Sequence, residues 1–232
     1  MAEPLVGRDA VLAAAGAHPY ARLTTADSDN VTGVREGSTV VWLTRAGTAV
    51  CGLGDGTVAA GAALRLATDS ARWWHLPRLG GPPPVEVRIR DEWDFRWTSS
   101  PPPTRAGEER ATPEADDDAI SALLDEAFPS TTTRPGDPRV RAWWAIRDGA
   151  HVVACAADRS RGGVGFLSGI AVRPNARGRG LGAALTAAMT RRLVAEFGIA
   201  ALGVMTDNVA ANAMYGSLGY TSSIPRTSVG LA

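Results

Sequence analysis

The sequence contains no lysine: all 24 of its basic residues are arginine, and 24 acidic residues balance them. Without lysine there is no Schiff-base lysine, no lysine base and no lysine in a phosphate-binding loop. The net charge of zero argues against the broad positive surface that binds duplex nucleic acid, so we expect no nucleic-acid partner. Any anion site in this chain must therefore use backbone amides and arginine.

Cysteine and histidine are also scarce, with two and three residues. Cys51 and Cys155 lie far apart in apolar runs, which is typical of buried thiols in a reducing compartment and argues against disulfide bonds. His18, His75 and His151 are too scattered to form a metal-ligand pattern, so we expect no metal.

Long apolar runs are missing as well. No run approaches the roughly 20 residues that a membrane-spanning helix needs. The first residues, MAEPLVGRDA, lack the basic and then apolar pattern of a signal peptide. We therefore expect a cytoplasmic protein with no membrane partner.

A proline-rich segment, SSPPPTRAG at residues 99–107, divides the chain, because three consecutive prolines favour an extended linker. We expect a smaller, degenerate α/β domain over residues 1–105 and a second domain over residues 106–232. The first domain carries no catalytic motif, and its tryptophans are expected to fill its core. Its expected helices cover residues 10–18 and 57–72, and its expected strands cover 39–44, 47–51, 85–90 and 91–100.

In the second half of the chain, segments whose apolar residues recur at helical spacing alternate more regularly with segments typical of strands. We expect helices over residues 117–128, 181–197 and 209–218, and strands over 140–147, 151–158, 163–172, 201–206 and from 220 onward. Asp148-Gly149 is a hairpin turn signal between two of these strands. The order predicts an α/β (α+β) fold with a mixed central sheet flanked by helices.

The segment IAVRPNARGRGLG, residues 170–182, carries the clearest chemical signal. It places a glycine-rich loop between a strand and an amphipathic helix, and glycine lets backbone N–H groups converge on one point. The first turn of the helix adds free N–H donors and the positive end of the helix dipole. Together with Arg177 and Arg179, these groups predict a site for a pyrophosphate.

With NVAANAMY following about thirty residues later, this half of the chain resembles the GNAT superfamily of acyl-CoA-dependent N-acetyltransferases, from about Glu108 to Ala232. The two-part layout also looks like the glycine-N-acyltransferase-like branch of that superfamily. The resemblance implies acetyl-CoA as cosubstrate. The residues that match CoA-contacting positions of the family are Ile170, Ala171, Val172, Arg177, Gly178, Arg179, Gly180, Leu181, Gly182, Asn208 and Ala211.

The resemblance also assigns a catalytic residue: Tyr215 matches the tyrosine that in many members protonates the departing thiolate. A phenol with a reference pKa near 10 suits a thiolate whose parent thiol titrates near 8.5. Many members carry a glutamate base on the fourth strand, but GVGFLSGIAV has no carboxylate there. The alternatives are a water held by Ser168, one of the side chains Glu126, His151 and Asp158, or an amine that arrives neutral, and we assign no base.

We therefore expect an N-acyltransferase that moves an acetyl group to a primary amine in a ternary complex. The acceptor, a small molecule or a peptide amine, is expected under the loop at residues 128–138, with a contribution from the N-terminal half. Two other readings stay open: a catalytically silent CoA sensor, and a dinucleotide-binding protein, because Gly178-x-Gly180-x-x-Ala183 also fits that fingerprint. The sequence indicates neither the acceptor, nor the length of the acyl group, nor the oligomeric state.

Overall fold

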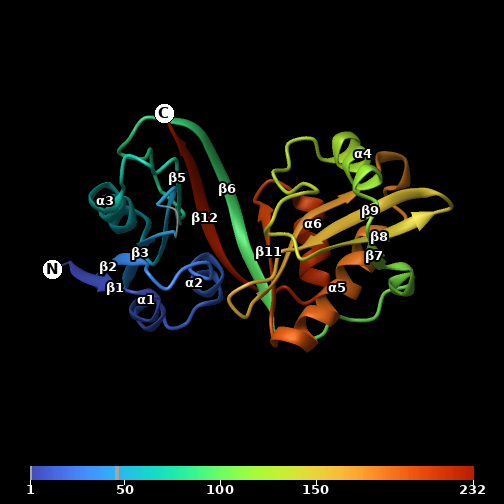
Figure 1. Cartoon of the computed structure of the whole chain (residues 1–232), viewed down its shortest axis with the longest axis horizontal. Coiled ribbons are helices and arrows are strands. Elements are labelled where there is room, and N and C mark those ends of the chain that lie inside the picture. Colours follow the sequence, from blue (N-terminus) through green and yellow to red (C-terminus); the bar gives the residue numbers. More distant parts are fainter. Residues whose placement is uncertain (1, 45–46) are drawn as a thin grey trace. The chain divides into compact units, whose positions relative to one another are not determined.

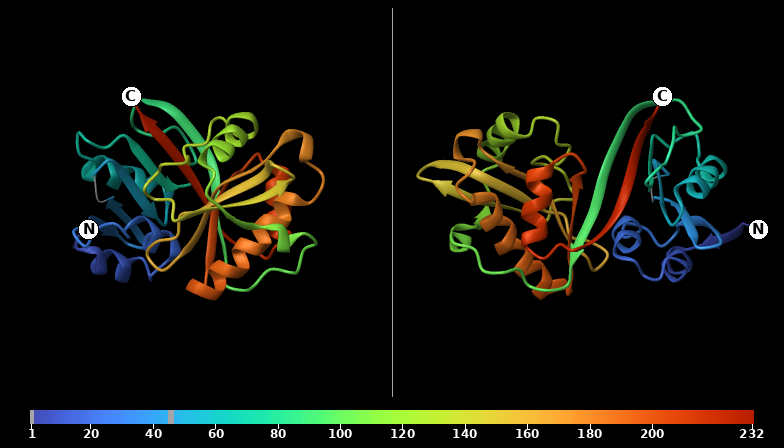
Figure 2. Two further views of the ribbon diagram at one scale, coloured as in Figure 1. Left: turned by 45° about the vertical axis from the view of Figure 1, so that its right-hand side comes forward. Right: turned by 180° about the vertical axis from the view of Figure 1, so that it is seen from behind.

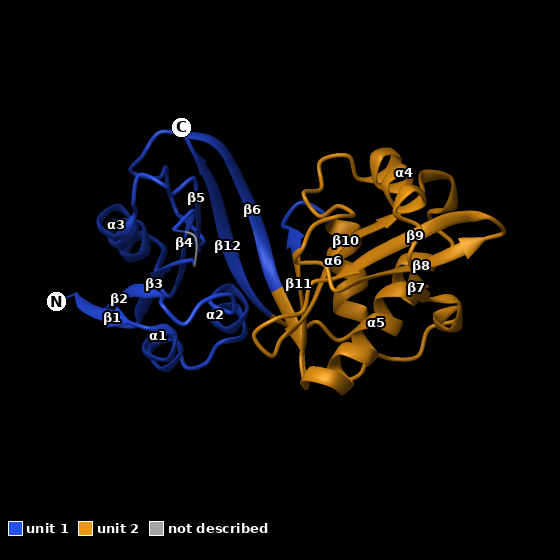
Figure 3. Ribbon diagram, in the orientation of Figure 1, with its two compact units in different colours: residues 1–95, 204–208, 223–232 blue, residues 96–203, 209–222 orange. Residues whose placement is uncertain are grey.

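The computed structural model describes residues 2–44 and 47–232 of the chain (Figure 1). These residues form two compact units, coloured separately in Figure 3. Unit 1 comprises residues 1–95, 204–208 and 223–232, and unit 2 comprises residues 96–203 and 209–222. This division differs from a single split after residue 105, because the last strand of the chain is hydrogen-bonded to a strand of unit 1.

Unit 1 is an α/β layer whose strands lie in the order β1-β2-β3-β4-β5-β12-β6. Strands β1 to β4 pair antiparallel, whereas β4 and β5 are parallel and are joined by the helix α3. The last residues of β6, 96–98, and the first residue of β12, residue 222, belong to unit 2. The elements are β1 (Glu3–Val6), α1 (Arg8–Ala14), α2 (Pro19–Thr24), β2 (Thr32–Glu36), β3 (Thr39–Leu43), β4 (Ala49–Leu53), α3 (Gly56–Leu66), β5 (Trp73–Pro77), β6 (Val87–Thr98) and β12 (Ser222–Leu231).

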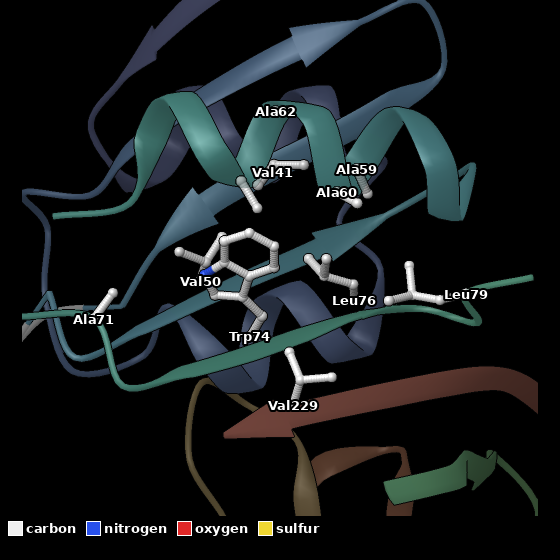
Figure 4. Packing of buried hydrophobic residues seen from close by; sticks show 11 residues of the cluster. Val41, Val50, Ala59, Ala60, Ala62, Ala71, Trp74, Leu76, Leu79 and Val229 are labelled. Atoms are coloured by element: carbon white, nitrogen blue, oxygen red, sulfur yellow. The ribbon is translucent and has the colours of Figure 1, made fainter. Parts of the chain in front are cut away.

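The sheet of unit 1 has an apolar core on each face, because successive residues of a strand point to opposite sides. On one face α3 packs over Val41 and Trp74 (Figure 4). On the other face the ring of Tyr20, from α2, lies 6.1 Å from that of Trp42. Trp42 and Trp74 are buried, as expected, whereas Trp73 is 36% exposed. Trp93 and Trp97 are only partly buried, so the expectation that the tryptophans fill the core holds for Trp42 and Trp74.

Unit 2 is a mixed sheet of order β11-β10-β9-β8-β7, in which only β10 and β11 pair in parallel. Helices α4 and α5 cover its opposite faces (Figure 2). The last two residues of β11, 204–205, belong to unit 1. The elements are the short 3₁₀ helix Glu108–Arg110, β7 (Thr112–Glu114), α4 (Asp117–Ala127), β8 (Ala142–Asp148), β9 (His151–Asp158), β10 (Gly165–Val172), the 3₁₀ helix Pro174–Ala176, α5 (Leu181–Phe197), β11 (Ala200–Met205) and α6 (Val209–Ser217). The expected fold class is confirmed.

The two units repeat one order of elements. A short strand, one or two helices and three antiparallel strands are followed by a helix and a parallel strand, first from β1 to β5 and again from β7 to β11. The helix that joins the parallel strands is α3 in the first copy and α5 in the second. Each unit therefore contains a pair of parallel strands, and the helix that joins them follows the first strand of that pair.

Several expected elements differ in the structure. The helix expected over residues 10–18 is α1, which already ends at Ala14, because Gly16 and Ala17 take positive φ angles. The sequence did not indicate α2, which begins at Pro19. The strands expected over residues 85–90 and 91–100 are one continuous strand, β6. The sequence did not indicate the strands β1, β2, β5 and β7.

Candidate functional site

The parallel strands β10 and β11 separate after only three residue pairs. The last of these pairs joins Leu167 to Leu202, and β10 then continues to Val172. Beyond Leu167, the described residues form no further pair between the two strands. We call this opening the β10–β11 splay. Its free strand edge offers backbone hydrogen-bonding groups to an extended ligand.

A bulge in β10 lies at the apex of the splay. Ser168 is opposite Ala157 and Ala171 is opposite Cys155, so three steps on β10 correspond to two on β9. Gly169 inside the bulge has φ +59, a left-handed conformation that favours glycine. The bulge thus changes the direction of the backbone at the point where β10 loses its partner on the β11 side.

The glycine-rich loop leads from β10 into α5. Gly178 and Gly180 have φ angles of +76 and +74, and a Cβ atom on either would meet nothing within 4 Å. Gly180 is the N-cap residue of α5, and no side chain caps this helix. The amides of its first turn are therefore left without a side-chain acceptor, and open space lies beside them. This geometry fits an anionic group such as a pyrophosphate.

The arginines of the loop contact protein acceptors. Arg177 donates to the carbonyl oxygens of Val172 and Ala127, each at 3.3 Å. Arg179 pairs with Asp148 at 3.4 Å, and both side chains are more than half exposed. Long, exposed contacts of this kind are weak, so the positive charge remains available near the loop. The backbone amides are the fixed part of this site.

Tyr215 lies on α6 and is 6% exposed. Its ring meets that of Tyr220 edge-on at 6.0 Å, and the Tyr220 hydroxyl is hydrogen-bonded to Thr190 at 2.7 Å. Burial raises the pKa of Tyr215 to about 12. The phenol is therefore neutral and carries a proton at any physiological pH.

The other predicted contact residues divide between the two units. Ala211 is on α6 in unit 2, with the loop and Tyr215, whereas Asn208 lies in the segment 204–208 that groups with unit 1. The structure thus gathers the loop, β10, Ala211 and Tyr215 in one unit. Asn208 directly precedes α6 in the sequence.

Most of the candidate bases already have partners. Glu126 is paired with Arg173, and the buried Asp158 accepts hydrogen bonds from Ser160 and pairs with Arg141. His151 lines a cavity of about 330 Å³, together with Asp148, Val153, Arg173, Asn175, Ala176 and Arg179. This cavity lies beside the loop and not at the apex of the splay. These contacts and this cavity therefore do not identify Glu126, Asp158 or His151 as the base.

A hydrogen-bonded chain that the sequence did not indicate reaches Ser168. The Ser168 hydroxyl lies 2.8 Å from that of Thr133, and buried Arg159 donates to Thr133 at 3.2 Å. Thr133 is 2% exposed, and its methyl group lies 3.3 Å from where a Cβ atom of Gly169 would be. Thr133 is 26 residues from Arg159 with no pattern to connect them. The one available signal was the glycine inside a strand, which often marks a bulge.

The parallel strands of unit 1 also separate after three pairs, but there an arginine side chain bridges them. The guanidinium of Arg226 donates to Gly52 O at 2.7 Å on β4 and to His75 O at 2.5 Å on β5. Arg226 is fully buried, and its guanidinium lies 3.9 Å from the centre of the Tyr20 ring. A side chain of the protein itself thus occupies the opening between the strands.

The N-terminus of α3 in unit 1 is likewise occupied. Asp55 accepts hydrogen bonds from the amides of Thr57 and Val58, each at 2.9 Å. A Cβ atom on Gly56 would lie 2.3 Å from the carbonyl oxygen of Arg78, so the backbone is tightly packed there. This helix start differs from that of α5 because a side chain caps it. A cavity of about 320 Å³ lies beside it, and its lining includes Asp55, Gly56 and Arg226.

Two further features concern residues 2–44 and 47–232, which the structure describes. No group of three or more His, Cys, Asp or Glu side chains there is arranged to hold a metal ion. Within the same residues, no helix is both long enough and apolar enough to span a bilayer.

Several solved structures similar to this chain are described as acetyltransferases. A GNAT-family protein from Novosphingobium aromaticivorans is 21% identical over 95% of this chain and 96% of its own, with a TM-score of 0.61. A GCN5-related N-acetyltransferase from Sphaerobacter thermophilus is 18% identical over 98% and 94%, with a TM-score of 0.57. One from Kribbella flavida is 20% identical over 85% and 88%, with a TM-score of 0.53. At sequence identities this low, the similarity to these structures shows the fold of the chain and nothing more specific.

The family itself is shown at the level of sequence. No curated protein matches the chain. A family model described as Acetyltransferase (GNAT) family, however, matches residues 93–220, which is more than half of the chain and includes β10, the loop, α5 and α6. Members of this family typically use acetyl-CoA. This protein belongs to the GNAT acetyltransferase family.

Proposed function

We propose that unit 2 is an N-acyltransferase that moves an acetyl group from acetyl-CoA to a primary amine in a ternary complex. The observation that carries the proposal is the β10–β11 splay leading directly into the uncapped start of α5. The splay offers a free strand edge, and the start of α5 offers convergent amides. Together they suit a long ligand with a pyrophosphate in the middle.

The residues of the chain divide the binding between them. The free edge of β10 pairs with the amide-containing arm of the cosubstrate, the loop amides hold its pyrophosphate, and α6 contacts its side. Acetyl-CoA supplies an activated thioester. The proposed contact residues are Ile170, Ala171, Val172, Arg177, Gly178, Arg179, Gly180, Leu181, Gly182, Asn208 and Ala211.

The proposed chemistry requires alignment and one proton donor. The amine nitrogen forms a bond to the thioester carbon, and the electron pair of the C–S bond leaves with sulfur. Tyr215 gives its proton to that sulfur and regains one from solvent, and the amine loses its extra proton to solvent. A backbone amide of β10 at the apex of the splay donates to the carbonyl oxygen as negative charge develops on it.

Calorimetry with CoA tests the binding part of this proposal. Gly180→Glu places a side chain and a negative charge on the loop, so we expect it to abolish binding. Gly198→Glu is the matched control, because Gly198 lies at the other end of α5 with nearly the same dihedral angles. The control carries the same left-handed strain, about 1–2 kcal/mol, away from the site. Equal binding by the two variants would contradict the loop assignment.

Release of free thiol from acetyl-CoA tests the turnover part. The assay is run across a panel of primary amines that includes amino acids, polyamines, aminoglycosides and short peptides. Thiol release that depends on one class of amine identifies the acceptor class. CoA binding without thiol release for any amine would instead favour a sensor that binds CoA without turnover.

A further inference from the structure

We propose that Ser168 is a hydrogen-bond donor to the reacting thioester carbonyl and that Thr133 and Arg159 hold it in that role. The proposal rests on the proposed function, since it places the thioester at the apex of the β10–β11 splay. It assigns Ser168 a task opposite to that of a base, because a donor stabilises negative charge and does not collect a proton.

The direction of the hydrogen bonds follows from the donors available. Arg159 has donors and no acceptor, so Thr133 Oγ1 accepts from it. Burial lowers the pKa of Arg159 to about 10, which still leaves it protonated at neutral pH. The charged groups that act on it are Asp137, Arg139 and Arg161. The positive end of the chain of hydrogen bonds is therefore fixed.

The Thr133 hydroxyl then has one O–H donor, which needs an acceptor. Thr133 is buried, and Ser168 Oγ at 2.8 Å is the acceptor that the described residues offer to it. If Ser168 donated instead, the Thr133 proton would be buried without an acceptor, which is unfavourable. Thr133 therefore donates to Ser168, and the Ser168 proton is directed to another partner. Hydrogen bonds in a chain polarise one another, which strengthens that last donor.

Ser168 is also in the right place to use its proton. It follows Leu167, the last residue of β10 that is paired with β11, and it precedes the bulge at Gly169. Ser168 is only partly buried, whereas Thr133 and Arg159 behind it are buried. The chain of donors thus begins in the interior and ends at the apex of the splay.

The first experiment measures Ser168→Ala against the natural protein with acetyl-CoA and the first amine of the panel that is acetylated. We expect kcat to fall on the order of 100-fold, as when a single donor to an oxyanion is removed, with CoA affinity unchanged. The ratio of the two kcat values should be constant from pH 6 to pH 10. A ratio that approaches one at high pH, where the amine is neutral, would mean that Ser168 helps a base, and would overturn the proposal.

A matched pair at Thr133 separates hydrogen bonding from packing. Thr133→Val keeps a methyl group against Gly169 but loses the hydroxyl, and Thr133→Ser does the reverse. We expect the valine variant to lose kcat at least threefold more than the serine variant. The double variant with Ser168→Ala should be no slower than Ser168→Ala alone, because Thr133 acts through Ser168. The opposite order, or losses that multiply, would refute the proposed chain.

The two proposals fail in different ways. If the natural protein binds no CoA or acetylates no amine, the proposed function fails before any variant is compared. If it is active and Ser168→Ala is equally active, only the role of Ser168 is wrong. Calorimetry with CoA and a thermal melt on each variant show that the fold and the loop are intact.

Discussion

At the scale of single residues, the position of Tyr215 determines how activity should depend on pH. Its pKa of about 12, raised by burial, means that the phenol loses its proton only well above pH 10. Throughout the range from pH 6 to pH 10 the hydroxyl is therefore present and able to donate. The hydroxyl is also a weak acid, so it acts by donating to sulfur as negative charge develops there and not by releasing its proton beforehand.

Tyr215→Phe should lower kcat roughly 100-fold, the low end for a general acid, and leave CoA affinity unchanged. The loss should be the same factor at every pH from 6 to 10, because the natural residue does not titrate there. The measurement is thiol release at saturating acetyl-CoA across that range. A loss confined to low pH, or no loss, would exclude Tyr215 as the proton donor.

The candidate site also shows which residues a sequence can reveal. Gly178 and Gly180 are close neighbours whose spacing has a direct conformational meaning, and the structure gives both positive φ angles. Thr133, Arg159 and Ser168 are distant in sequence and meet only because a loop folds over the bulge of β10. A local pattern could be predicted, and a contact that depends on tertiary packing could not.

The same distinction holds for whole elements. Helix α4 was predicted from its apolar spacing, and Ile120, Leu123 and Leu124 on that spacing are buried. In the strand β5, WWHLP, apolar and polar residues do not alternate regularly. This segment is a strand because it pairs with β4 and β12. Short strands without a two-residue period therefore escaped prediction, because their neighbours and not their own residues define them.

Arg226 gives a prediction at the scale of elements, because it bridges β4 and β5 where they stop pairing. Arg226→Met keeps the apolar stem but leaves two buried carbonyl groups without donors. We expect the free energy of unfolding to fall by about 2–4 kcal/mol, since each unsatisfied group costs about 1–3 kcal/mol and removal of a buried charge offsets part of this. The measurement is urea unfolding followed by tryptophan fluorescence.

Arg88→Met is the control for that experiment. Arg88 also donates to a backbone carbonyl, Leu231 O at 2.8 Å, but it is exposed. We expect its effect to stay within about 0.5 kcal/mol, as for most surface substitutions. If the two variants were equally stable, Arg226 would not be the group that holds the two strands together.

At the scale of the whole molecule, the chain contains one arrangement of elements twice, and the two copies differ where their parallel strands separate. In unit 2 the parallel strands separate beside uncapped helix amides. In unit 1 Arg226 bridges the two strands where they separate, and Asp55 binds the equivalent amides. The same order of elements thus leaves the helix amides uncapped in one copy and bonded to a side chain of the protein in the other, and the difference lies in a few side chains.

We therefore expect one molecule of CoA to bind per chain. Calorimetric titration of the protein should give a stoichiometry of one, and Gly180→Glu should remove all of the heat, because in unit 1 Asp55 and Arg226 already bind the amides and carbonyl groups at the corresponding place. For CoA to enter unit 1, the Arg226 guanidinium would have to leave two buried carbonyl groups, and the phosphates would have to displace the Asp55 carboxylate, which repels them. Both costs oppose binding at that opening. A stoichiometry of two, or one equivalent of binding left in the Gly180→Glu variant, would show that the first copy has kept its own site.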